Sequence, residues 1–535
     1  MSDSAPLPPS GSSQHPISRA VIIAVLAASL MVGALAISTQ SYWIDEALSL
    51  IVAMAPNPAE AWKYAQAVSG STLQMLLYQF YLYVWHKAFG SGEWVMRSSN
   101  LPWFVLGQLA FLLLLRHKPK LALLGCLLAA VSPILWVYLD ETRPYVMQYA
   151  AACWLTAALV RLTTRQSSPA SAGTSSYAPT SPAVGEQLSL MEITAIAGAA
   201  VVLFASSLIG VIWCGAFFMA FAVVLARQKS GGPASRPTLW LVGLSTLALL
   251  IGFTTYYVLT WQDAGRGYHR SGPSLLSLPF IAYELLGFSG FGPGKLQMRA
   301  APVASVLGSL PALLPLAATF AALGFFAITH IKRDAWNKPT ATAWLIALGL
   351  PILAIFAAMF LFDHRPLPRH FIPALPAIIL ALAALLQRAL EQNSILWRAV
   401  AVLLPLLWLV SAFNYRWNPS HAKEDYRNAA KVAAAAIAEN KEVWWAADPA
   451  AAYIYLTPIA MQEVPGRAWA MQAPAWDDIR FKFPPRVIIV SKPDIYDPQG
   501  AVARYAAENR FVPALQLHAF TIFTREGDKL PAVTP

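Results

Sequence analysis

Long apolar runs are the feature that most constrains this chain. From residue 20 to about residue 415, segments of roughly 20 predominantly apolar residues recur between short charged turns. A helix of about 20 residues crosses a hydrocarbon core of about 30 Å. Only helices and closed barrels satisfy backbone hydrogen bonds in lipid, and runs without alternation predict helices. We expect an all-α polytopic membrane protein with about eleven transmembrane helices. The expected spans are 20–38, 95–115, 121–139, 146–163, 191–207, 209–226, 239–260, 303–329, 341–362, 371–387 and 397–415.

The composition agrees with a membrane protein. Of 535 residues, 57% are hydrophobic and only 12% are charged, whereas a soluble chain carries about 25% charge. The cysteines Cys126, Cys153 and Cys214 all lie in apolar runs, which excludes a disulfide framework or a metal-binding cysteine pattern. The net charge of +11 indicates basic cytoplasmic loops and contacts with anionic lipid rather than nucleic-acid binding.

Basic residues predict the orientation of the chain. If the N-terminus is cytoplasmic, nearly every inner loop is basic, as the positive-inside rule requires. An odd number of spans then places residues 416–535 outside the cytoplasm. The inner basic residues are Arg19, Arg116, Lys118, Lys120, Arg161, Arg165, Arg227, Lys229, Arg236, Lys332, Arg333, Lys338, Arg388 and Arg398.

Two segments have a composition typical of disorder. Residues 1–19 are rich in Ser and Pro, and residues 166–188 are rich in Ser, Pro, Ala and Thr. We interpret the first as a disordered cytoplasmic N-terminus and the second as a disordered cytoplasmic loop. Residues 20–415, which include this second segment, form the predicted transmembrane domain.

Three regions outside the spans are expected to be structured. The outer loop 41–92 contains aromatic, amphipathic stretches that predict helices lying at the membrane interface. A second outer loop covers residues 261–300. Residues 416–535 alternate short β-branched runs with helical patterns, which predicts a small extracytoplasmic α/β domain that covers or shapes the site.

Charged residues collect on the outer side. Acidic residues follow the first span and fill the turn at residues 140–145, and basic residues lie in loop 261–300 and before the tenth span. Basic residues outside are exceptions to the positive-inside rule. One explanation is binding of a lipid phosphate, because Arg binds phosphate in a bidentate manner. Pairing with nearby carboxylates or lipid headgroups is the alternative.

Such residues could support glycosyl transfer from a lipid phosphate. A phosphate leaves readily once preorganised cations stabilise its charge. The acceptor hydroxyl needs a carboxylate that takes its proton, and a base opposite the leaving group inverts the anomeric carbon. Asp45 is the best candidate for this base, because it follows the first span near the membrane surface. A solvated loop without function is the other interpretation of Asp45 and Glu46.

Five motifs occur in a characteristic order. They are residues 43–49 (WIDEALS), 81–90 (YLYVWHKAFG) with Glu93 and Arg97, 140–145 (DETRPY), 369–376 (RHFIPALP) and 424–427 (EDYR). From about residue 20 to residue 430, the chain resembles integral-membrane glycosyltransferases of the GT-C fold. The resemblance is to the bacterial branch related to protein mannosyltransferases and to the lipid A aminoarabinose and galacturonic acid transferases.

The resemblance implies a function and a set of site residues. The donor is a polyprenyl-phosphate-linked sugar, with no nucleotide-sugar site, and the acceptor is lipid A or lipopolysaccharide, a protein or an envelope glycan. The enzyme lies in the bacterial inner membrane with its site facing the periplasm. Asp45 is the implied base, and Arg143, Arg365, Arg369 and Lys295 lie near the donor phosphate. We take Asp45 and Glu46 as candidate catalytic residues. The candidate substrate-binding residues are Asp140, Glu141, Arg143, Tyr145, Arg266, Arg270, Lys295, Arg365, Arg369 and His370.

The chain departs from the family pattern at two positions. Residues 69–72 (SGST) replace the His-Pro-Pro-type sequence that opens the interfacial helix, and His370 replaces a Tyr. The histidines show no paired ligand spacing such as His-x3-His. We therefore expect no metal and no cofactor, and a divalent cation held by Asp45 and Glu46 is the alternative.

Three other functions compete with this interpretation. A transporter or flippase would favour internal repeats and ionisable residues at the membrane midplane, whereas the ionisable residues here lie at predicted helix ends. A scaffold subunit would not need Asp45, Arg143 and Arg369. An O-antigen-ligase-type enzyme would share the outer basic residues but would not need the early acidic motif.

Overall fold

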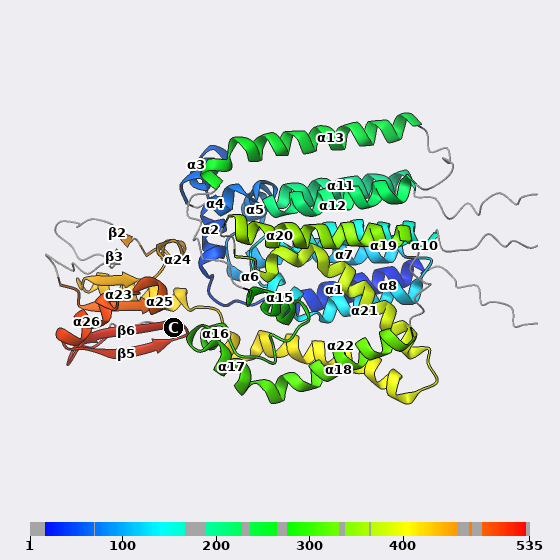
Figure 1. Cartoon of the computed structure of the whole chain (residues 1–535). Helices are drawn as coiled ribbons and strands as arrows, with labels where there is room; N and C mark the ends of the chain where they lie inside the picture. The colour runs from blue at the N-terminus through cyan, green and yellow to red at the C-terminus, as the bar shows by residue number, and fades with distance from the viewer. Residues whose placement is uncertain are drawn as a thin grey trace, which may run out of the picture.

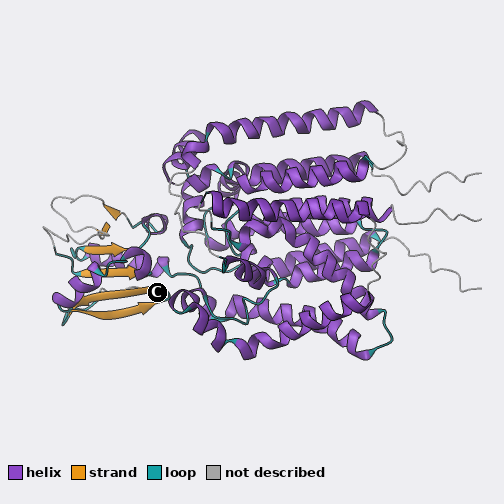
Figure 2. Cartoon of the chain, viewed as in Figure 1, coloured by secondary structure: helices purple, strands orange, loops and turns teal. Residues whose placement is uncertain are grey.

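A computed structural model describes most of the chain. The described residues are 17–68, 70–165, 189–226, 236–264, 275–330, 338–362, 365–457, 459–460, 470–472 and 484–530. They form a bundle of long helices that run side by side, with a smaller unit containing all the described strands at one end (Figure 2).

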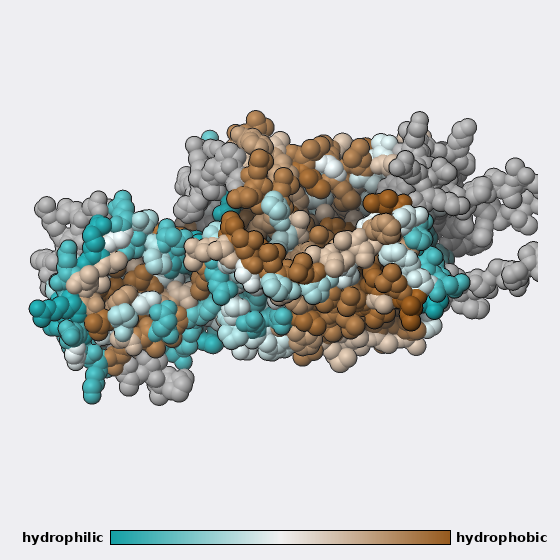
Figure 3. Space-filling view, turned by 60° about the horizontal axis from the view of Figure 1, so that its bottom comes forward, coloured by the Kyte–Doolittle hydropathy of each residue, from teal (hydrophilic) through white to brown (hydrophobic). Residues whose placement is uncertain are grey.

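The long helices follow the predicted apolar runs. On the face shown in Figure 3, hydrophobic residues cover most of the bundle, whereas the strand-containing unit carries more hydrophilic residues. In water such a surface would be unstable, so it marks the part of the molecule that faces lipid. The helices are α1 (Arg19–Ala36), α7 (Asn100–Leu114), α8 (Pro119–Val131), α9 (Pro133–Leu139), α10 (Tyr145–Arg165), α11 (Leu190–Ser206), α12 (Leu208–Leu225), α13 (Arg236–Leu259), α18 (Leu310–His330), α19 (Lys338–Trp344) continuing through η2 (Leu345–Gly349) into α20 (Leu350–Leu361), η3 (Pro368–Ala374) with α21 (Leu375–Leu390), and α22 (Ile395–Trp417).

The multi-pass architecture is confirmed, but the predicted number of spans is not. Within the described residues, eight helices are long and apolar enough to cross a membrane, and the pair α8 and α9, bent by 59°, raises this to nine. The other two expected spans, α7 and α11, are helices of 15 and 17 residues, which is shorter than a span of about 20 residues. Both pack against α10 inside the bundle. Eleven spans therefore remain a prediction.

Shorter helices gather at the end of the bundle that carries the strand-containing unit (Figure 1). These confirm that the first outer loop is helical, as its amphipathic pattern predicts. They are α2 (Ile44–Ala53), α3 (Pro58–Val68), α4 (Gly70–Leu73), α5 (Leu76–Phe89) and α6 (Glu93–Ser98), followed later in the chain by α14 (Trp261–Ala264), α15 (Ser277–Leu285), α16 (Lys295–Ala300) and α17 (Pro302–Gly308).

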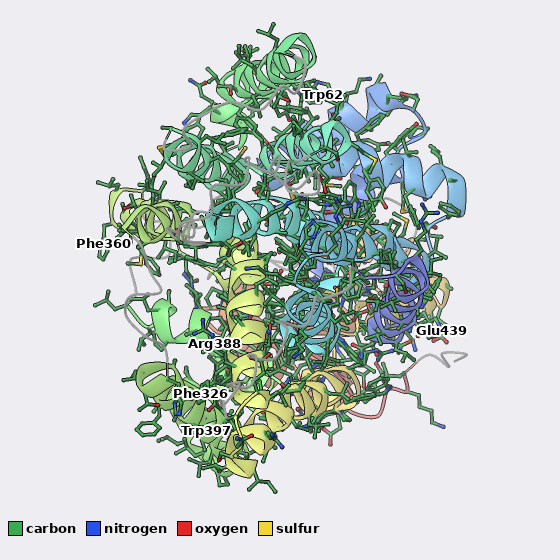
Figure 4. All side chains as sticks on the ribbon, turned by 90° about the vertical axis from the view of Figure 1, so that its right-hand side faces the viewer. Trp62, Phe326, Phe360, Arg388, Trp397 and Glu439 are labelled. Atoms are coloured by element: carbon green, nitrogen blue, oxygen red, sulfur yellow. The ribbon has the colours of Figure 1, made fainter. Side chains whose placement is uncertain are left out.

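The opposite end of the bundle is simpler. There Phe326 of α18 and Trp397 of α22 face each other, with ring centroids 5.0 Å apart (Figure 4). Arg388, near the end of α21, lies at the same end (Figure 4). The turn between α7 and α8, which carries Arg116 and Lys118, also lies at this end (Figure 1). The basic loops and the short outer helices therefore occupy opposite ends of the bundle.

The C-terminal unit is the predicted small α/β domain. Its described strands form a six-stranded sheet in the order β2-β3-β1-β4-β6-β5. The first four in that order are parallel, and β6 and β5 are antiparallel additions. Its elements are α23 (Tyr426–Ala438), β1 (Val443–Ala446), α24 (Pro449–Ile454), β2 (Ile459–Ala460), β3 (Ala470–Gln472), β4 (Val487–Ser491), α25 (Pro493–Tyr496), α26 (Ala501–Glu508), β5 (Phe511–Leu517) and β6 (Phe520–Arg525).

The α/β domain packs directly on α2. Ala47, on α2, belongs to the same buried apolar cluster as Tyr426 and Ala451 of the domain. Ile44 packs against this cluster as well. Part of the hydrophobic core of the domain is therefore provided by the first outer loop, and the two regions are expected to order together.

A glycine-rich connection joins α15 to α16 and packs against α22. The Ser411 hydroxyl donates to the Gly287 carbonyl at 2.6 Å, and the Gly290 amide donates to the Ser411 hydroxyl at 3.2 Å. A Cβ atom on Gly290 would lie 1.9 Å from the Ser411 carbonyl oxygen. The connection therefore needs glycine at position 290 to approach α22 and to present Lys295 beside the first outer loop.

We predict that Gly290→Ala lowers the thermal stability of the purified protein. The added methyl group meets backbone, which cannot rotate away, and such overpacking costs about 1–3 kcal/mol. Thermal unfolding in detergent measures the change. Gly324→Ala is the matched control, because a Cβ atom there meets nothing within 4 Å. Equal melting temperatures for the two variants would contradict the packing described.

Candidate active site

The site is built on the first turn of α2. Asp45 and Glu46 are the second and third residues of this helix, where the helix dipole favours negative charge. Successive helical residues point about 100° apart, so the two carboxylates face different surroundings. Two adjacent acidic residues can therefore have different roles.

Asp45 forms an ion pair with Arg369 at the start of η3. The distance from Arg369 Nη1 to Asp45 Oδ2 is 2.7 Å, and the Asp45 and Arg369 side chains are 22% and 28% exposed. Burial raises the pKa of Asp45, but the positive charges of Arg143 and Arg369 outweigh burial and lower the pKa below its usual value. Asp45 is thus an ionised carboxylate that remains accessible.

Arg143 fixes α2 from a second direction. Its Nη1 donates to the Asp45 carbonyl oxygen at 3.2 Å and to the Ser49 hydroxyl at 2.9 Å. The buried Nε of Arg143 has no hydrogen-bond partner. The DETRPY turn therefore brings a second guanidinium group beside Asp45, and one of its donors is not engaged by the protein.

Glu46 has a different environment. Its side chain is fully buried and accepts two hydrogen bonds from Arg97, each 2.8 Å long. The backbone amide of Thr142 and the ammonium group of Lys423 also donate to it, at 3.0 and 3.1 Å. Burial raises the pKa of Glu46, but Arg97 and Lys423 outweigh burial and lower it to about 2.

Asp140 completes a buried charge cluster with Glu46, Arg97 and Lys423. Its Oδ2 accepts from the Ser38 hydroxyl at 2.8 Å and lies 3.4 Å from Lys423 Nζ, and its Oδ1 lies 3.8 Å from Arg97 Nε. Lys423 also donates to the Asp140 carbonyl oxygen. The cluster contains two carboxylates and two cations, so its formal charge is zero.

A third group of charges surrounds Lys295, the first residue of α16. Its Nζ lies 3.9 Å from Glu141 Oε1 and 5.4 Å from the centre of the Trp43 ring. The Lys295 side chain is 64% exposed, so its ammonium group is available to a ligand. Burial raises the pKa of Glu284, on α15, to about 7, and Glu141 adds to this while Lys295 and Arg369 oppose it.

A pocket of about 670 Å³, including its open mouth, adjoins these charges. It lies between the first outer loop, the end of α22 and the α/β domain. Its walls combine aromatic rings with charged side chains, which suits a polar ligand that also has apolar faces. The lining residues include Trp43, Trp136, Asp140, Glu141, Lys295, Tyr415, Arg416, His421, Lys423 and His518.

The structure brings most of the predicted site residues together, but not all of them. Tyr145 packs against Tyr138, with ring centroids 4.6 Å apart and the ring planes tilted by 59°. His370 Nδ1 accepts from the Leu367 amide at 3.2 Å, so its ring contributes to the local turn. Arg365 is exposed. Arg266 and Arg270 lie outside the described residues.

Two residues that the motifs did not single out belong to the site. Lys423 lies directly before the EDYR motif, and Glu284 lies in the second outer loop. The position of Lys423 in the sequence gives no sign of its partners, Glu46 and Asp140, since these lie more than 100 residues away. Glu284 is influenced by Lys295 of the same loop and by Glu141 and Arg369 from other parts of the chain. The only feature of the sequence that could have indicated Lys423 as a site residue is its position directly before the EDYR motif.

The described residues contain no group of three or more His, Cys, Asp or Glu side chains that could hold a metal ion. The Asp45 carboxylate is paired with Arg369, and the Glu46 carboxylate with Arg97 and Lys423. The expectation that no metal or cofactor is needed stays a prediction.

We predict that Glu46→Gln destabilises the protein strongly. Removing one partner of a buried ion pair leaves the other charge uncompensated, which costs about 3–5 kcal/mol. Since the pKa of Glu46 is lowered from 4.5 to about 2, its contribution to stability is present above pH 4.5 and is lost as the pH falls toward 2. Thermal unfolding of wild type and variant as a function of pH measures both effects.

The double variant Glu46→Gln/Arg97→Met is the control for this pair. The double variant removes both charges. Its loss of stability should therefore be smaller than the sum of the losses caused by Glu46→Gln and Arg97→Met alone. Additive losses, or a Glu46→Gln protein with wild-type stability, would contradict the assignment of Glu46 to the buried charge cluster.

Comparison with known proteins identifies the fold. No family model matches the sequence, and no curated protein matches it. Two crystal structures of ArnT from Cupriavidus metallidurans are similar in structure. The apo state aligns with a TM-score of 0.51 and 14% identity over 94% of this chain and 97% of ArnT. The form bound to undecaprenyl phosphate aligns with a TM-score of 0.51 and 13% identity over 96% and 99%. The chain therefore has the GT-C fold that its motifs predict.

Proposed function

We propose that this protein is an inverting glycosyltransferase that moves a sugar from a polyprenyl-phosphate carrier to an extracytoplasmic acceptor. The observation that carries the proposal is the ionised, accessible Asp45 carboxylate 2.7 Å from Arg369. Arg143 and Lys295 add positive charge around it. The fold adds support, because ArnT, which shares it, has been crystallised with undecaprenyl phosphate.

Cations are the main requirement for a phosphate leaving group. Arg369, Arg143 and Lys295 come from three separate parts of the chain and converge around Asp45. Guanidinium groups bind phosphate oxygens with paired hydrogen bonds. In this arrangement the donor phosphate binds Arg369, whose side chain is 28% exposed, and the surrounding cations stabilise the negative charge that develops as the sugar departs.

Asp45 supplies the base. The acceptor hydroxyl oxygen forms a bond to the anomeric carbon while the bond from that carbon to the phosphate oxygen breaks. Asp45 takes the hydroxyl proton, and the electron pair of the broken bond leaves on the carrier phosphate. Attack opposite the leaving group inverts the anomeric carbon. A lowered pKa keeps Asp45 ionised at neutral pH, so its oxygens carry no proton when the acceptor hydroxyl binds.

Glu46 is assigned a supporting role in this mechanism. Its oxygens are occupied by Arg97, Thr142 and Lys423, and its side chain is inaccessible to a substrate. We infer that Glu46 holds the first turn of α2 in place, so that Asp45 is the carboxylate that reacts.

An apolar groove suits the isoprenoid chain of such a donor. It lies between α11, α12 and α13, with Trp261 of α14 at its edge. A long hydrocarbon chain is excluded from water and needs a surface of this kind. The groove is lined by Phe204, Leu208, Val211, Thr254, Tyr257, Val258 and Trp261.

The distribution of charge supports a periplasmic site in a bacterial inner membrane. The end of α21, which carries Arg388, and the basic α7–α8 turn lie at one end of the bundle, and α2, which carries Asp45, and the α/β domain lie at the other (Figure 1). By the positive-inside rule the basic end is cytoplasmic. The site then faces the periplasm, where an envelope lipid, glycan or protein would serve as acceptor.

We predict that Asp45→Asn abolishes most sugar transfer while the protein stays folded. Loss of a general base slows a reaction by about a hundredfold to ten-thousandfold. The assay measures sugar release from a panel of polyprenyl-phosphate sugars by protein reconstituted in lipid, with Asp494→Asn as a control in the α/β domain. Wild-type turnover of one donor names the sugar. If Asp45→Asn turns over at the wild-type rate, Asp45 is not the base.

We predict a separate effect of Arg369→Gln on donor binding. A hydrogen bond to a charged group contributes about 1.5–3 kcal/mol, so KM for the donor should rise about tenfold to a hundredfold. Arg369 also lowers the pKa of Asp45, and its loss should therefore move the acid limb of the pH–rate profile to higher pH. Arg388→Gln, at the opposite end of the bundle, should change neither quantity. Unchanged donor affinity and pH profile in Arg369→Gln would exclude the phosphate role.

A further inference from the structure

The α/β domain reaches into the site through three polar side chains. Tyr455, at the end of α24, accepts a hydrogen bond from the Tyr42 amide at 2.7 Å and donates to Glu93 Oε1 at 3.0 Å. Arg427 pairs with the same Glu93 oxygen at 3.0 Å. Lys423 bridges Glu46 and Asp140. The domain thus contacts the segment that leads directly into α2 and Asp45.

Lys423 is the contact that pairs with Glu46, the residue next to Asp45. Its backbone amide donates to Gln40 Oε1 at 2.7 Å, which fixes the backbone against the first outer loop. Its ammonium group lies between the Glu46 carboxylate, at 3.1 Å, and the Asp140 carboxylate, at 3.4 Å. The side chain is 14% exposed. An ammonium group with two carboxylate partners at this distance is strongly constrained.

The two carboxylates need both cations of the buried charge cluster. Arg97 donates a hydrogen bond to each oxygen of the Glu46 carboxylate, but its Nε lies 3.8 Å from Asp140 Oδ1. Without Lys423, two buried carboxylates would share one cation, and they would repel each other where solvent does not screen them. The two segments would then move apart, or one of the carboxylates would take up a proton.

These segments are also the ones that define the geometry at Asp45. Glu46 follows Asp45 in the first turn of α2, and Asp140 begins the turn that carries Arg143. Arg143 in turn donates to the Asp45 carbonyl oxygen and to Ser49. A separation of the two segments would therefore change the position of Asp45 relative to Arg143 and Arg369.

We propose that Lys423 is a positioning residue for the reaction at Asp45, through which docking of the α/β domain completes the active site. The domain is then a part of the catalytic unit and not a passive cover. The kinetic part of this inference rests on the proposed glycosyl transfer, whereas its structural part does not. Lys423 itself touches no reacting atom. It acts by joining Glu46 to Asp140.

The test compares Lys423→Met with two other variants of the full chain in lipid nanodiscs. Lys423→Met keeps the length of the side chain and removes its charge. Lys423→Arg keeps the charge and is the conservative variant. Lys492→Met is the matched control, because Lys492 also belongs to the α/β domain, is 5% exposed and pairs with a glutamate, Glu424, at 2.5 Å. It contacts neither Glu46 nor Asp140 through an ion pair.

The first readout is kinetic, with the polyprenyl-phosphate sugar that wild type consumes. Lys423→Met should lower kcat at least about tenfold, while KM for the donor stays within about twofold, because Arg369, the proposed contact to the donor phosphate, lies on η3 and outside both segments. Lys423 lowers the pKa of Glu46, so its loss should also move the acid limb of the pH–rate profile to higher pH. Lys423→Arg should recover most of kcat, and Lys492→Met should show neither change.

The second readout is independent of activity. Hydrogen–deuterium exchange measures the opening of the backbone in residues 42–49 and 140–145. Lys423→Met should speed exchange in both segments, and Lys492→Met should speed it in neither. Wild-type exchange together with wild-type kcat and pH profile in Lys423→Met would overturn the proposal, as would equal effects of Lys492→Met. If wild type consumes no donor, the proposed function fails, and the exchange measurement alone decides whether Lys423 holds the two segments.

Discussion

The buried charge cluster of Glu46, Arg97, Asp140 and Lys423 is the interaction on which the site depends. Taking four ionised groups out of water is costly, and the cost is offset only when each charge has its partners at hydrogen-bond distance. The members come from α2, α6, the turn after α9 and the segment before α23. No one of these segments can bury its own charge, so the site forms only when all of them are in place.

The same constraint separates the roles of two adjacent acidic residues. In the sequence, Asp45 and Glu46 are both candidate catalytic residues, and Asp45 is the better candidate for the base. In the structure, Glu46 faces the cluster and is saturated by cations and an amide, whereas Asp45 faces Arg369 and remains partly exposed. Their angular separation on the first turn of one helix is enough to direct Glu46 toward the protein interior and Asp45 toward the more exposed side of the helix.

The sequence predicts the long apolar helices better than it predicts the contacts between charged residues. The runs that predict α1, α10 and α22 depend only on local composition, and the motif order is sufficient to predict the GT-C fold. The number of spans is harder to predict, since α7 and α11 are shorter than the runs around them. The partners of Lys423 and the environment of Glu284 arise from residues far apart in the chain, and local patterns contain no information about such pairs.

The position of the α/β domain follows from this distribution of charge. An apolar bundle provides rigid helix ends but few polar groups to orient a carboxylate at the membrane surface. The domain supplies what the bundle lacks: a lysine for the cluster, a tyrosine for the Tyr42 amide and an apolar surface for Ala47. Because these contacts converge on the first turn of α2, the orientation of Asp45 depends on both parts of the molecule.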